Sequence, residues 1–202
     1  MEKSGAPRSA TAVPGESENG LPEVVALREG YVVGIQAVSL EDRELLRRMF
    51  SRLSRESIYQ RFHMPYPSVP EWAVALFIGS HEPQGKYLVA VVGNNIVGHA
   101  MYTRSEDGRS ADIGIIVEDE WQRRGIGKLL LSKLAAAVRR QRIEAFTGVV
   151  FGENRATMRL VTAVFTEVRS TVRGGQYEIY VPLAGFDTPQ DPYLRFPHRR
   201  GK

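Results

Sequence analysis

The sequence contains no cysteine, which excludes disulfide bonds, thiolate metal ligands and a cysteine nucleophile. Its four histidines are scattered, with no pair at the helical spacing of a metal site, so no bound metal is expected. No apolar run approaches the ~20 residues that a bilayer span requires. The first 20 residues also lack the apolar segment of a secretory signal. We therefore expect a cytoplasmic protein with no membrane partner.

Charge of one sign is only slightly in excess: 27 basic and 23 acidic residues give a net charge of +4. Through Glu41–Arg61 the two signs alternate, which is typical of a solvated helical face. The excess lies in Arg123–Lys128, Arg139–Arg142 and Arg195–Lys202. The phosphates of a small ligand account for the first cluster as well as a nucleic acid does, and nucleic-acid binding through the basic tail would rest on few residues.

The length suits one domain with tails. Residues 1–21 are polar and contain two prolines, which predicts a disordered N-terminal tail. Residues 22–184 are expected to form the folded domain. Residues 185–202 carry three prolines and basic side chains, which predicts an irregular basic tail.

Hydrophobic periodicity and turn residues predict alternating strands and helices. Helices are expected at Leu40–Leu53, Pro70–Phe77, Gly125–Arg140 and Arg155–Phe165. Strands are expected at Lys86–Val92, Ile96–His99, Ala111–Val117, Ala145–Phe151, Val168–Val172 and Tyr177–Val181, after a hairpin or interrupted strand within Val24–Val38. The first three of these strands should form an antiparallel meander. The helix between the third and the fourth favours a parallel pair, so the fold class is α/β with a mixed sheet.

The clearest helix, Gly125–Arg140, is expected to bury one stripe and expose the opposite face. The buried stripe comprises Ile126, Leu130, Leu134 and Val138, and the exposed positions include Lys128, Ser132 and Arg139.

The most informative segment is Gln122–Lys128, which lies between a predicted strand and the start of this helix. The first amides of a helix have no intrahelical acceptor and, with the helix dipole, favour an anion. Gly125 and Gly127 remove side chains that would hold a ligand away from the backbone, while Arg123, Arg124 and Lys128 add positive charge. We therefore predict a pyrophosphate site, although a glycine pair can also serve only to start a helix.

Two other phosphate motifs do not fit. A P-loop requires Ser or Thr after its lysine, and Leu129 follows Lys128 here. A dinucleotide fingerprint requires a third glycine where Leu130 stands.

Gln122-Arg123-Arg124-Gly125-Ile126-Gly127 resembles the [QR]-x-x-G-x-[GA] motif of the GCN5-related N-acetyltransferases. The resemblance extends to Gly93–Ala100, Ala111–Val117 and Val150–Leu160, and covers about residues 24–181. It implies the acyl-CoA N-acyltransferase fold: a mixed, mostly antiparallel sheet with flanking helices and a splayed central strand pair.

The N-terminal half resembles one subgroup, the bacterial protein lysine acetyltransferases. The residues that carry this resemblance are Leu27–Gly30, Glu41-Asp42 and Arg52–Phe62. The apolar side chains of Leu53, Ile58 and Phe62 can also simply pack the domain, and the two interpretations are compatible.

The resemblance implies direct transfer of an acetyl group from acetyl-CoA to an amine, with a protein lysine favoured as acceptor. A small amine as acceptor, or a non-catalytic acyl-CoA-binding module, remains an alternative. A homodimer is possible. No metal takes part in the implied chemistry.

Asp112 is the candidate general base, at a position where the subgroup usually carries glutamate. Because aspartate is one methylene shorter, a bridging water could be needed. The alternative is that Asp112 only caps the turn after Arg109. The resemblance assigns cofactor binding to Ile115, Ile116, Val117, Gln122, Arg123, Arg124, Gly125, Ile126, Gly127, Lys128 and Asn154. Among these, the amides at Ile116–Val117 are the expected oxyanion donors, and Asn154 can instead cap the following helix.

Two positions depart from the family pattern. Many members carry a tyrosine acid seven residues after the asparagine, where Val161 stands, and the usual Gly-Phe appears as Phe165-Thr166. A thiolate with a thiol pKa of ~8.5 leaves adequately without such an acid.

The remaining polar and aromatic candidates carry weaker signals. Loop solvation is the favoured role for Glu118, Asp119 and Glu120. Tyr59, Arg61 and His63 could line an acceptor groove, but surface or core roles are favoured. His99, Trp72 and Trp121 are expected to be structural.

Overall fold

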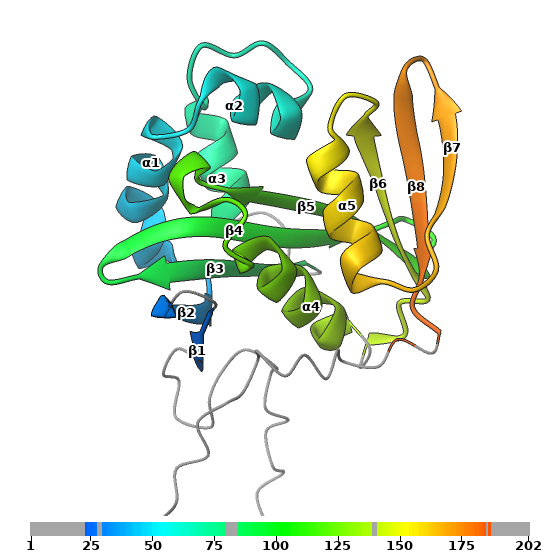
Figure 1. Cartoon of the computed structure of the whole chain (residues 1–202), viewed down its shortest axis with the longest axis horizontal. Coiled ribbons are helices and arrows are strands. Elements are labelled where there is room, and N and C mark those ends of the chain that lie inside the picture. Colours follow the sequence, from blue (N-terminus) through cyan, green and yellow to red (C-terminus); the bar gives the residue numbers. More distant parts are fainter. Residues whose placement is uncertain (1–22, 28–29, 80–84, 139–140, 185, 187–202) are drawn as a thin grey trace, which may run out of the picture.

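The computed structural model describes residues 23–27, 30–79, 85–138, 141–184 and 186. Within them a single eight-stranded sheet has the order β1-β2-β3-β4-β5-β6-β8-β7 (Figure 1). The strands are β1 Glu23–Ala26, β2 Val32–Ala37, β3 Lys86–Val92, β4 Asn95–Arg104, β5 Ser110–Val117, β6 Ala145–Phe151, β7 Arg169–Arg173 and β8 Gln176–Pro182. The α-helices are α1 Arg43–Ser51, α2 Arg55–Phe62, α3 Glu71–Ile78, α4 Ile126–Val138 and α5 Arg155–Val164. The expected tails 1–21 and 185–202 lie outside the described residues except for Phe186, and Arg139 lies outside them as well.

The predicted meander β3-β4-β5 is confirmed, and Val24–Val38 forms the antiparallel hairpin β1-β2. Strand β4 runs to Arg104, well past the predicted end at His99, because its second half pairs with β5 from Ala100↔Ile115 to Arg104↔Ala111. That extension depends on a partner strand and has no local turn signal to mark it. The α/β mixed fold predicted from the sequence is therefore confirmed.

The central pair β5-β6 is parallel and splayed, as expected. Its ladder covers only Ser110↔Ala145, Ala111↔Phe146 and Asp112↔Thr147. Beyond Asp112, β5 continues along β4 to Val117, while β6 follows β8 up to Phe151. The two strands therefore separate, and the β5 edge beyond Asp112 faces a gap between them.

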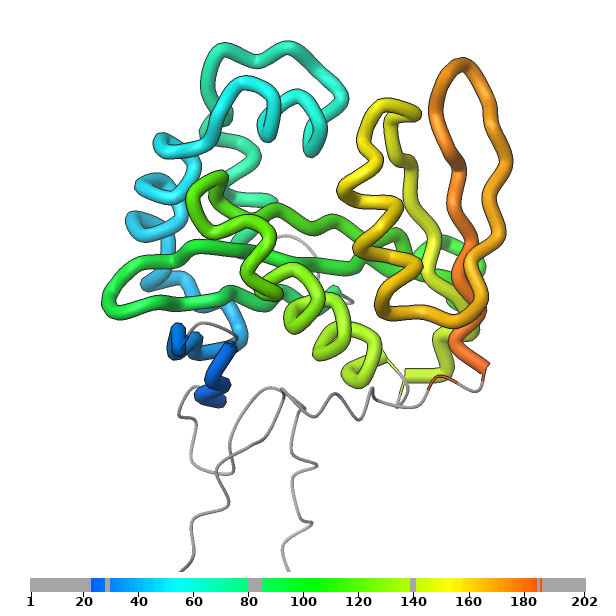
Figure 2. Tube along the Cα trace, viewed as in Figure 1, coloured from blue at the N-terminus to red at the C-terminus, as the bar shows by residue number. Residues whose placement is uncertain are grey.

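Alternating side chains of β3 divide the core into two clusters. Leu88 and Ala90 face a cluster with α4 and α5, and Tyr87 and Val89 face one with α1, α2 and α3. Figures 1 and 2 show these two groups of helices on either side of the sheet. The alternation follows from the period of two of a strand, and it places α2 opposite α4 and α5.

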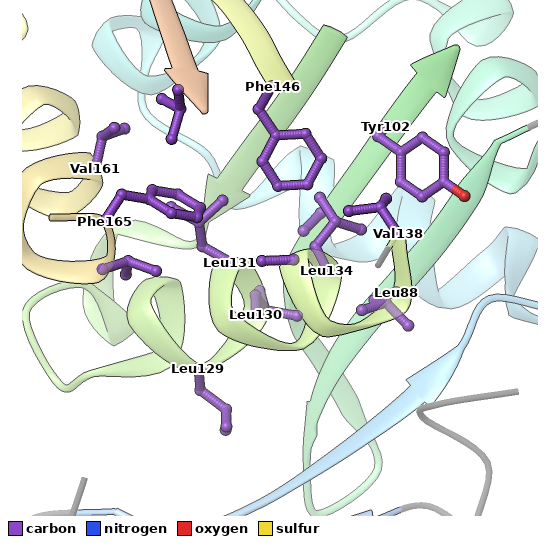
Figure 3. Packing of buried hydrophobic residues seen from close by; sticks show 14 of the residues in the cluster. Leu88, Tyr102, Leu129, Leu130, Leu131, Leu134, Val138, Phe146, Val161 and Phe165 are labelled. Atoms are coloured by element: carbon purple, nitrogen blue, oxygen red, sulfur yellow. The ribbon is translucent and has the colours of Figure 1, made fainter. Parts of the chain in front are cut away.

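Helix α4 buries more of its surface than the predicted stripe. Leu130, Leu134 and Val138 face the sheet as expected (Figure 3). Leu129, Leu131 and Ser132 are buried as well, so the prediction that Ser132 faces out is wrong. Helix α5 packs on the side of α4 that carries Gly127, a second packing surface that no local pattern reveals.

The sequence analysis missed helix α2. The single helix predicted over Leu40–Leu53 is a 3₁₀ turn, Leu40–Asp42, followed by α1. A separate helix, α2, then begins at Arg55. The restart carries a capping signal, since the hydroxyl of Ser54 accepts a hydrogen bond from the amide of Ser57 at 3.1 Å. α2 ends at His63, whose φ of 56° is left-handed. In the part of the chain described here, no helix has the length and apolar character to cross a membrane.

The core continues beyond the expected domain boundary at residue 184. Phe186 is 9% exposed and its ring centroid lies 5.1 Å from that of Phe165. Phe165, where many relatives are expected to have glycine, fills the core between Phe146 and Phe186.

Candidate active site

A cleft of about 960 Å³ opens where β5 and β6 separate. Its walls come from α2, β5, the start of α4, β6 and α5. The predicted site residues that line it are Asp112, Ile115, Ile116, Val117, Gln122, Arg123, Gly125, Gly127, Lys128 and Asn154. Predicted residues up to 42 positions apart in sequence (Asp112 and Asn154) thus meet in one cleft, and only Arg124 and Ile126 of the predicted set do not line it.

The loop before α4 has the backbone of an anion site. Arg123 and Gly125 have φ angles of 61° and 92°, both left-handed. The first helical bond runs from the amide of Leu129 to the carbonyl of Gly125 at 3.0 Å, so the amides that precede Leu129 form the free end of the helix. The side chain of Ile126 is 1% exposed, so this residue can offer a ligand only its backbone. The arrangement suits the pyrophosphate predicted from the sequence.

Arg124 faces away from the cleft. Its Nε donates to the carbonyl of Glu120 at 3.1 Å, and its guanidinium lies 4.5 Å from the ring centroid of Tyr31 and 5.0 Å from that of Trp121. These cation–π contacts hold the loop against Tyr31, the residue that directly precedes β2. Trp121 is a packing residue, as predicted.

The two motif glycines have different structural roles. A Cβ on Gly125 would make only an ordinary contact, 3.8 Å from Cδ2 of Leu27, but its φ of 92° is one that side-chain-bearing residues rarely adopt. A Cβ on Gly127 would lie 3.2 Å from Cδ2 of Leu160 on α5. Gly125 therefore shapes the loop, while Gly127 also permits the close packing of α4 on α5.

Polar side chains fasten this loop to α2. The Gln122 amide donates to Oγ of Ser57 at 3.2 Å and to the carbonyl of Val117 at 3.1 Å. The Asp119 carboxylate accepts from the amide and hydroxyl of Ser54 and from the hydroxyl of Ser57, at 2.9, 2.6 and 2.9 Å. Burial opposes its charge, but these hydrogen bonds lower the pKa of Asp119 overall. The expectation that Asp119 only solvates the loop is wrong.

Glu118 is also not a solvated loop residue. It is 3% exposed, and its two oxygens accept from Nε and Nη2 of Arg52 at 2.7 and 2.9 Å. Nη2 of Arg52 also donates to the carbonyl of Ile96 at 3.1 Å. This bidentate pair joins the end of α1 to the end of β5.

Replacing Arg52 with alanine should lower the free energy of unfolding by about 2–3 kcal/mol, because it leaves the Glu118 charge buried and unpaired. Urea denaturation measures the change. Arg48→Ala is the control, since Arg48 pairs with Glu44 on the exposed face of α1 and should change stability little. Equal effects of the two variants would contradict the structural role given to Glu118.

Asp112 lies at the point where β5 leaves β6, and its side chain reaches the cleft. It does not cap the turn after Arg109, because the amides of Arg109 and Ser110 donate to Asp107 at 2.8 and 3.1 Å. Burial raises the pKa of Asp112 above its ordinary value, and the positive charge of Arg61 opposes part of that rise. A carboxylate with a raised pKa is a stronger base than a solvated one.

Asn154 is the N-cap of α5. Its Oδ1 accepts from the amide of Thr157 at 2.9 Å, and the residue also lines the cleft. The capping role considered from the sequence is thus confirmed. Only Oδ1 of Asn154 takes part in this cap, and its Nδ2 group does not. Val161, at the position of the family's tyrosine, is 2% exposed and forms part of the core.

Residues of α2 and its C-cap His63 form the opposite wall, whereas Tyr59 does not line the cleft and instead packs on the end of β6. The rings of Tyr59 and Phe151 stack with centroids 4.9 Å apart, and the His63 ring lies 4.2 Å from Phe151. Arg61 and His63 line the cleft beside Asp112. The favoured surface or core role does not describe these two residues. Arg61 belongs to the Arg52–Phe62 stretch that resembles the subgroup, and His63 directly follows that stretch.

His99 has the structural role that was expected of it. It is fully buried, with Nε2 2.8 Å from the carbonyl of Phe77, and burial lowers its pKa to about 3. Trp72 packs edge-on against Phe62 and Tyr66 but is 55% exposed. Across the described segments, His, Asp and Glu side chains form no group of three that could hold a metal ion.

A sheet whose central strands splay beside a helix N-terminus is the arrangement that the resemblance to the acyl-CoA N-acyltransferases implies. Residues 44–164 match the Acetyltransferase (GNAT) family, and the chain belongs to that family. It is an acetyltransferase that uses acetyl-CoA to acetylate an amine.

The chain is similar to several characterised proteins. It is 26% identical to the L-amino acid N-acetyltransferase AaaT of Escherichia coli (strain K12) over 155 residues, which cover 71% of this chain and 91% of AaaT. The GNAT domain of S. lividans PAT has a TM-score of 0.73 at 23% identity, covering 83% of this chain and 99% of that domain. Spermidine N-acetyltransferase from Vibrio cholerae has a TM-score of 0.58 at 17% identity, covering 76% and 97%. The two structural likenesses show the shared fold.

Proposed function

We propose that this chain transfers acetyl by direct attack of a neutral amine on the thioester of acetyl-CoA, with Asp112 as the base. A lysine-like amine with a pKa of ~10.4 must lose a proton, which costs roughly 4–5 kcal/mol at neutral pH. The position of Asp112 at the fork of β5 and β6 is the observation that carries the proposal. The attacking nitrogen forms the new bond to the acetyl carbon, the carbon–sulfur bond breaks, and the proton passes to Asp112 directly or through a water.

The free edge of β5 supplies backbone groups for the acetyl donor. The amide of Glu118 donates to Val97 of β4 at 2.9 Å, and strand alternation then directs the amide of Ile116 to β4 as well. The amides of Ile115 and Val117 point to the gap. Of the expected oxyanion donors, Val117 therefore fits and Ile116 contributes only its buried side chain.

The remaining cofactor contacts follow the sequence prediction. We assign the pyrophosphate to the backbone of Arg123–Lys128, with the charges of Arg123 and Lys128 nearby, and Gln122 to holding the loop in place. The side-chain amide of Asn154 is assigned to the pantetheine arm. Lining residues Arg155 and Arg159 of α5 were missed, and they add positive charge to the same wall.

Asn154→Ser should raise the KM for acetyl-CoA by about tenfold while leaving stability unchanged, because serine keeps the N-cap but has no amide to donate. Steady-state kinetics and urea denaturation measure the two effects. Asn154→Ala is the comparison, and it should lose about 1 kcal/mol of stability in addition. An unchanged KM in the serine variant would limit Asn154 to its capping role.

Two acceptor classes have support. A protein lysine is supported by the resemblance of Arg52–Phe62 to the protein lysine acetyltransferases and by the exposed apolar side chains of Tyr59, Met64 and Trp72 on and after α2. A free amino acid is supported by the likeness to AaaT. The cytoplasmic location and the homodimer remain predictions.

The test is to incubate the protein with acetyl-CoA and panels of amino acids, polyamines and lysine peptides, and to follow thiol release and acetylation. Turnover of any amine supports the proposal. Coenzyme A binding without turnover of any acceptor would instead support a non-catalytic acyl-CoA-binding module.

A further inference from the structure

Arg61 is a buried cation at the acceptor wall of the cleft. It comes from the last turn of α2 and lies over Gly114 of β5, where a Cβ would lie within 2.8 Å of its guanidinium carbon. Gly114 and Asp112 are two residues apart on β5, so they lie on the same face of the sheet. The glycine thus makes room for a guanidinium beside the proposed base.

The partners of this guanidinium are weak. Nη2 contacts Sδ of Met101 at 3.5 Å, and Nε is inaccessible to solvent with no hydrogen-bond partner in the described chain. The guanidinium carbon lies 4.9 Å from the ring centroid of Phe77 and 5.6 Å from that of Phe62. Burial lowers its pKa to about 10, with Asp112 as the opposing charge, so it remains a cation at neutral pH.

The other titratable groups around it do not compensate this charge. His63, in the αL cap of α2, has a pKa lowered by burial and by Arg61, and His99 of β4 has a pKa of about 3. Both are therefore neutral at pH 7. Glu56 of α2 also lines the cleft, where its carboxylate accepts a hydrogen bond from the side-chain amide of Gln60. Asp112 is the carboxylate whose charge acts on Arg61, and no ion pair within 4.0 Å joins the two in the structure described. A cation with so few strong acceptors is costly unless an anion reaches it.

We propose that Arg61 binds the carboxylate of the acceptor, and that the acceptor is therefore a free amino acid. This inference rests on the proposed acetyl transfer with Asp112 as base. A zwitterion presents an ammonium to Asp112 and a carboxylate to Arg61, whose planar fork suits carboxylate geometry. A protein lysine or a polyamine brings only positive charge, which Arg61 repels.

The experiment compares each of the common L-amino acids with its α-carboxamide, which keeps the shape and the amine but removes the negative charge. For the preferred amino acid, wild type should show a kcat/KM about 100-fold above that of the amide. Arg61→Met should lower kcat/KM for the acid about 100-fold, mainly through KM, and should change that for the amide far less, only through the effect of the Arg61 charge on Asp112. Arg61→Lys should restore part of the loss for the acid. Coenzyme A affinity and the thermal midpoint, measured on each variant, separate this effect from misfolding.

Other outcomes overturn the inference. Equal losses for acid and amide in Arg61→Met would show that Arg61 acts through Asp112 or the fold. Faster turnover of lysine peptides than of any amino acid, with no effect of Arg61→Lys, would assign the site to protein. If wild type acetylates nothing, the proposed function fails. Calorimetric titration of the amino acids into the protein saturated with coenzyme A then tests Arg61 alone. If an amino acid binds to wild type and not to Arg61→Met, the carboxylate site at Arg61 is upheld. If no amino acid binds to wild type, the site is refuted.

Discussion

Asp112→Asn should lower kcat/KM for amine acetylation by about 10²–10⁴-fold, the usual contribution of a positioned general base. Asparagine keeps the size of the side chain but cannot take the proton. The loss should appear in kcat, measured by thiol release with saturating acetyl-CoA. Coenzyme A affinity should not change, because Asp112 lies on the acceptor wall with Arg61 and not on the phosphate loop.

The pH profile sharpens this prediction. In wild type, log kcat/KM should rise with pH through the pKa of Asp112, which burial places above the ordinary value for aspartate. Asp112→Asn should remove that limb. Asp112→Glu is the matched control: it keeps the base, adds the methylene that the subgroup usually has, and should retain most of the activity. An unchanged profile in Asp112→Asn would exclude Asp112 as the base.

Asp112→Asn should not lower the stability of the protein, although it lowers the activity. The pKa of Asp112 is raised in the folded protein, so the folded state binds more protons than the unfolded state between the two pKa values. Stability from this group is therefore lost as pH rises through that window, and ionised Asp112 opposes folding at neutral pH. Asp112→Asn should leave the thermal midpoint at pH 7 equal or higher, which separates lost catalysis from unfolding.

Gly125→Val should weaken coenzyme A binding by at least about 100-fold, measured by calorimetry. A β-branched residue cannot adopt a φ of 92° without strain, so the amides at the start of α4 turn away from the phosphates. The added side chain would not clash with the protein, since the nearest atom to a Cβ, Cδ2 of Leu27, is 3.8 Å away.

Gly93→Val is the control for backbone strain. Gly93 also has a left-handed φ, of 57°, and open space around it, but it lies in the β3-β4 turn and does not line the cleft. The Gly93→Val substitution should lower the free energy of unfolding and leave coenzyme A affinity unchanged. Gly127→Val is less informative, because contact with Leu160 would disturb the packing of α4 on α5. Full affinity in Gly125→Val would refute the assignment of the pyrophosphate to this loop.

Local sequence patterns predicted most of the elements, because periodicity and turn residues act over a few positions. β6 was predicted at its observed ends, Ala145–Phe151, and α5 to within one residue. The errors lie where a distant partner decides. β4 extends because β5 pairs with it, and α4 has a second packing surface because α5 lies against its Gly127 side. α2 was missed because only two of its residues, Ile58 and Phe62, were read as apolar, without a clear helical stripe.

The sequence by itself determined the glycine-rich loop that we propose binds the pyrophosphate, since a helix start, its glycines and its charges are contiguous in Gln122–Lys128. It also determined the family through that loop and its flanking strands. Only the tertiary structure decided what surrounds Asp112. Arg61 lies 51 positions before it in the chain, and the two meet because α2 packs on β5 beside Gly114. Contacts of that kind depend on how the helices cover the sheet, which no local spacing encodes.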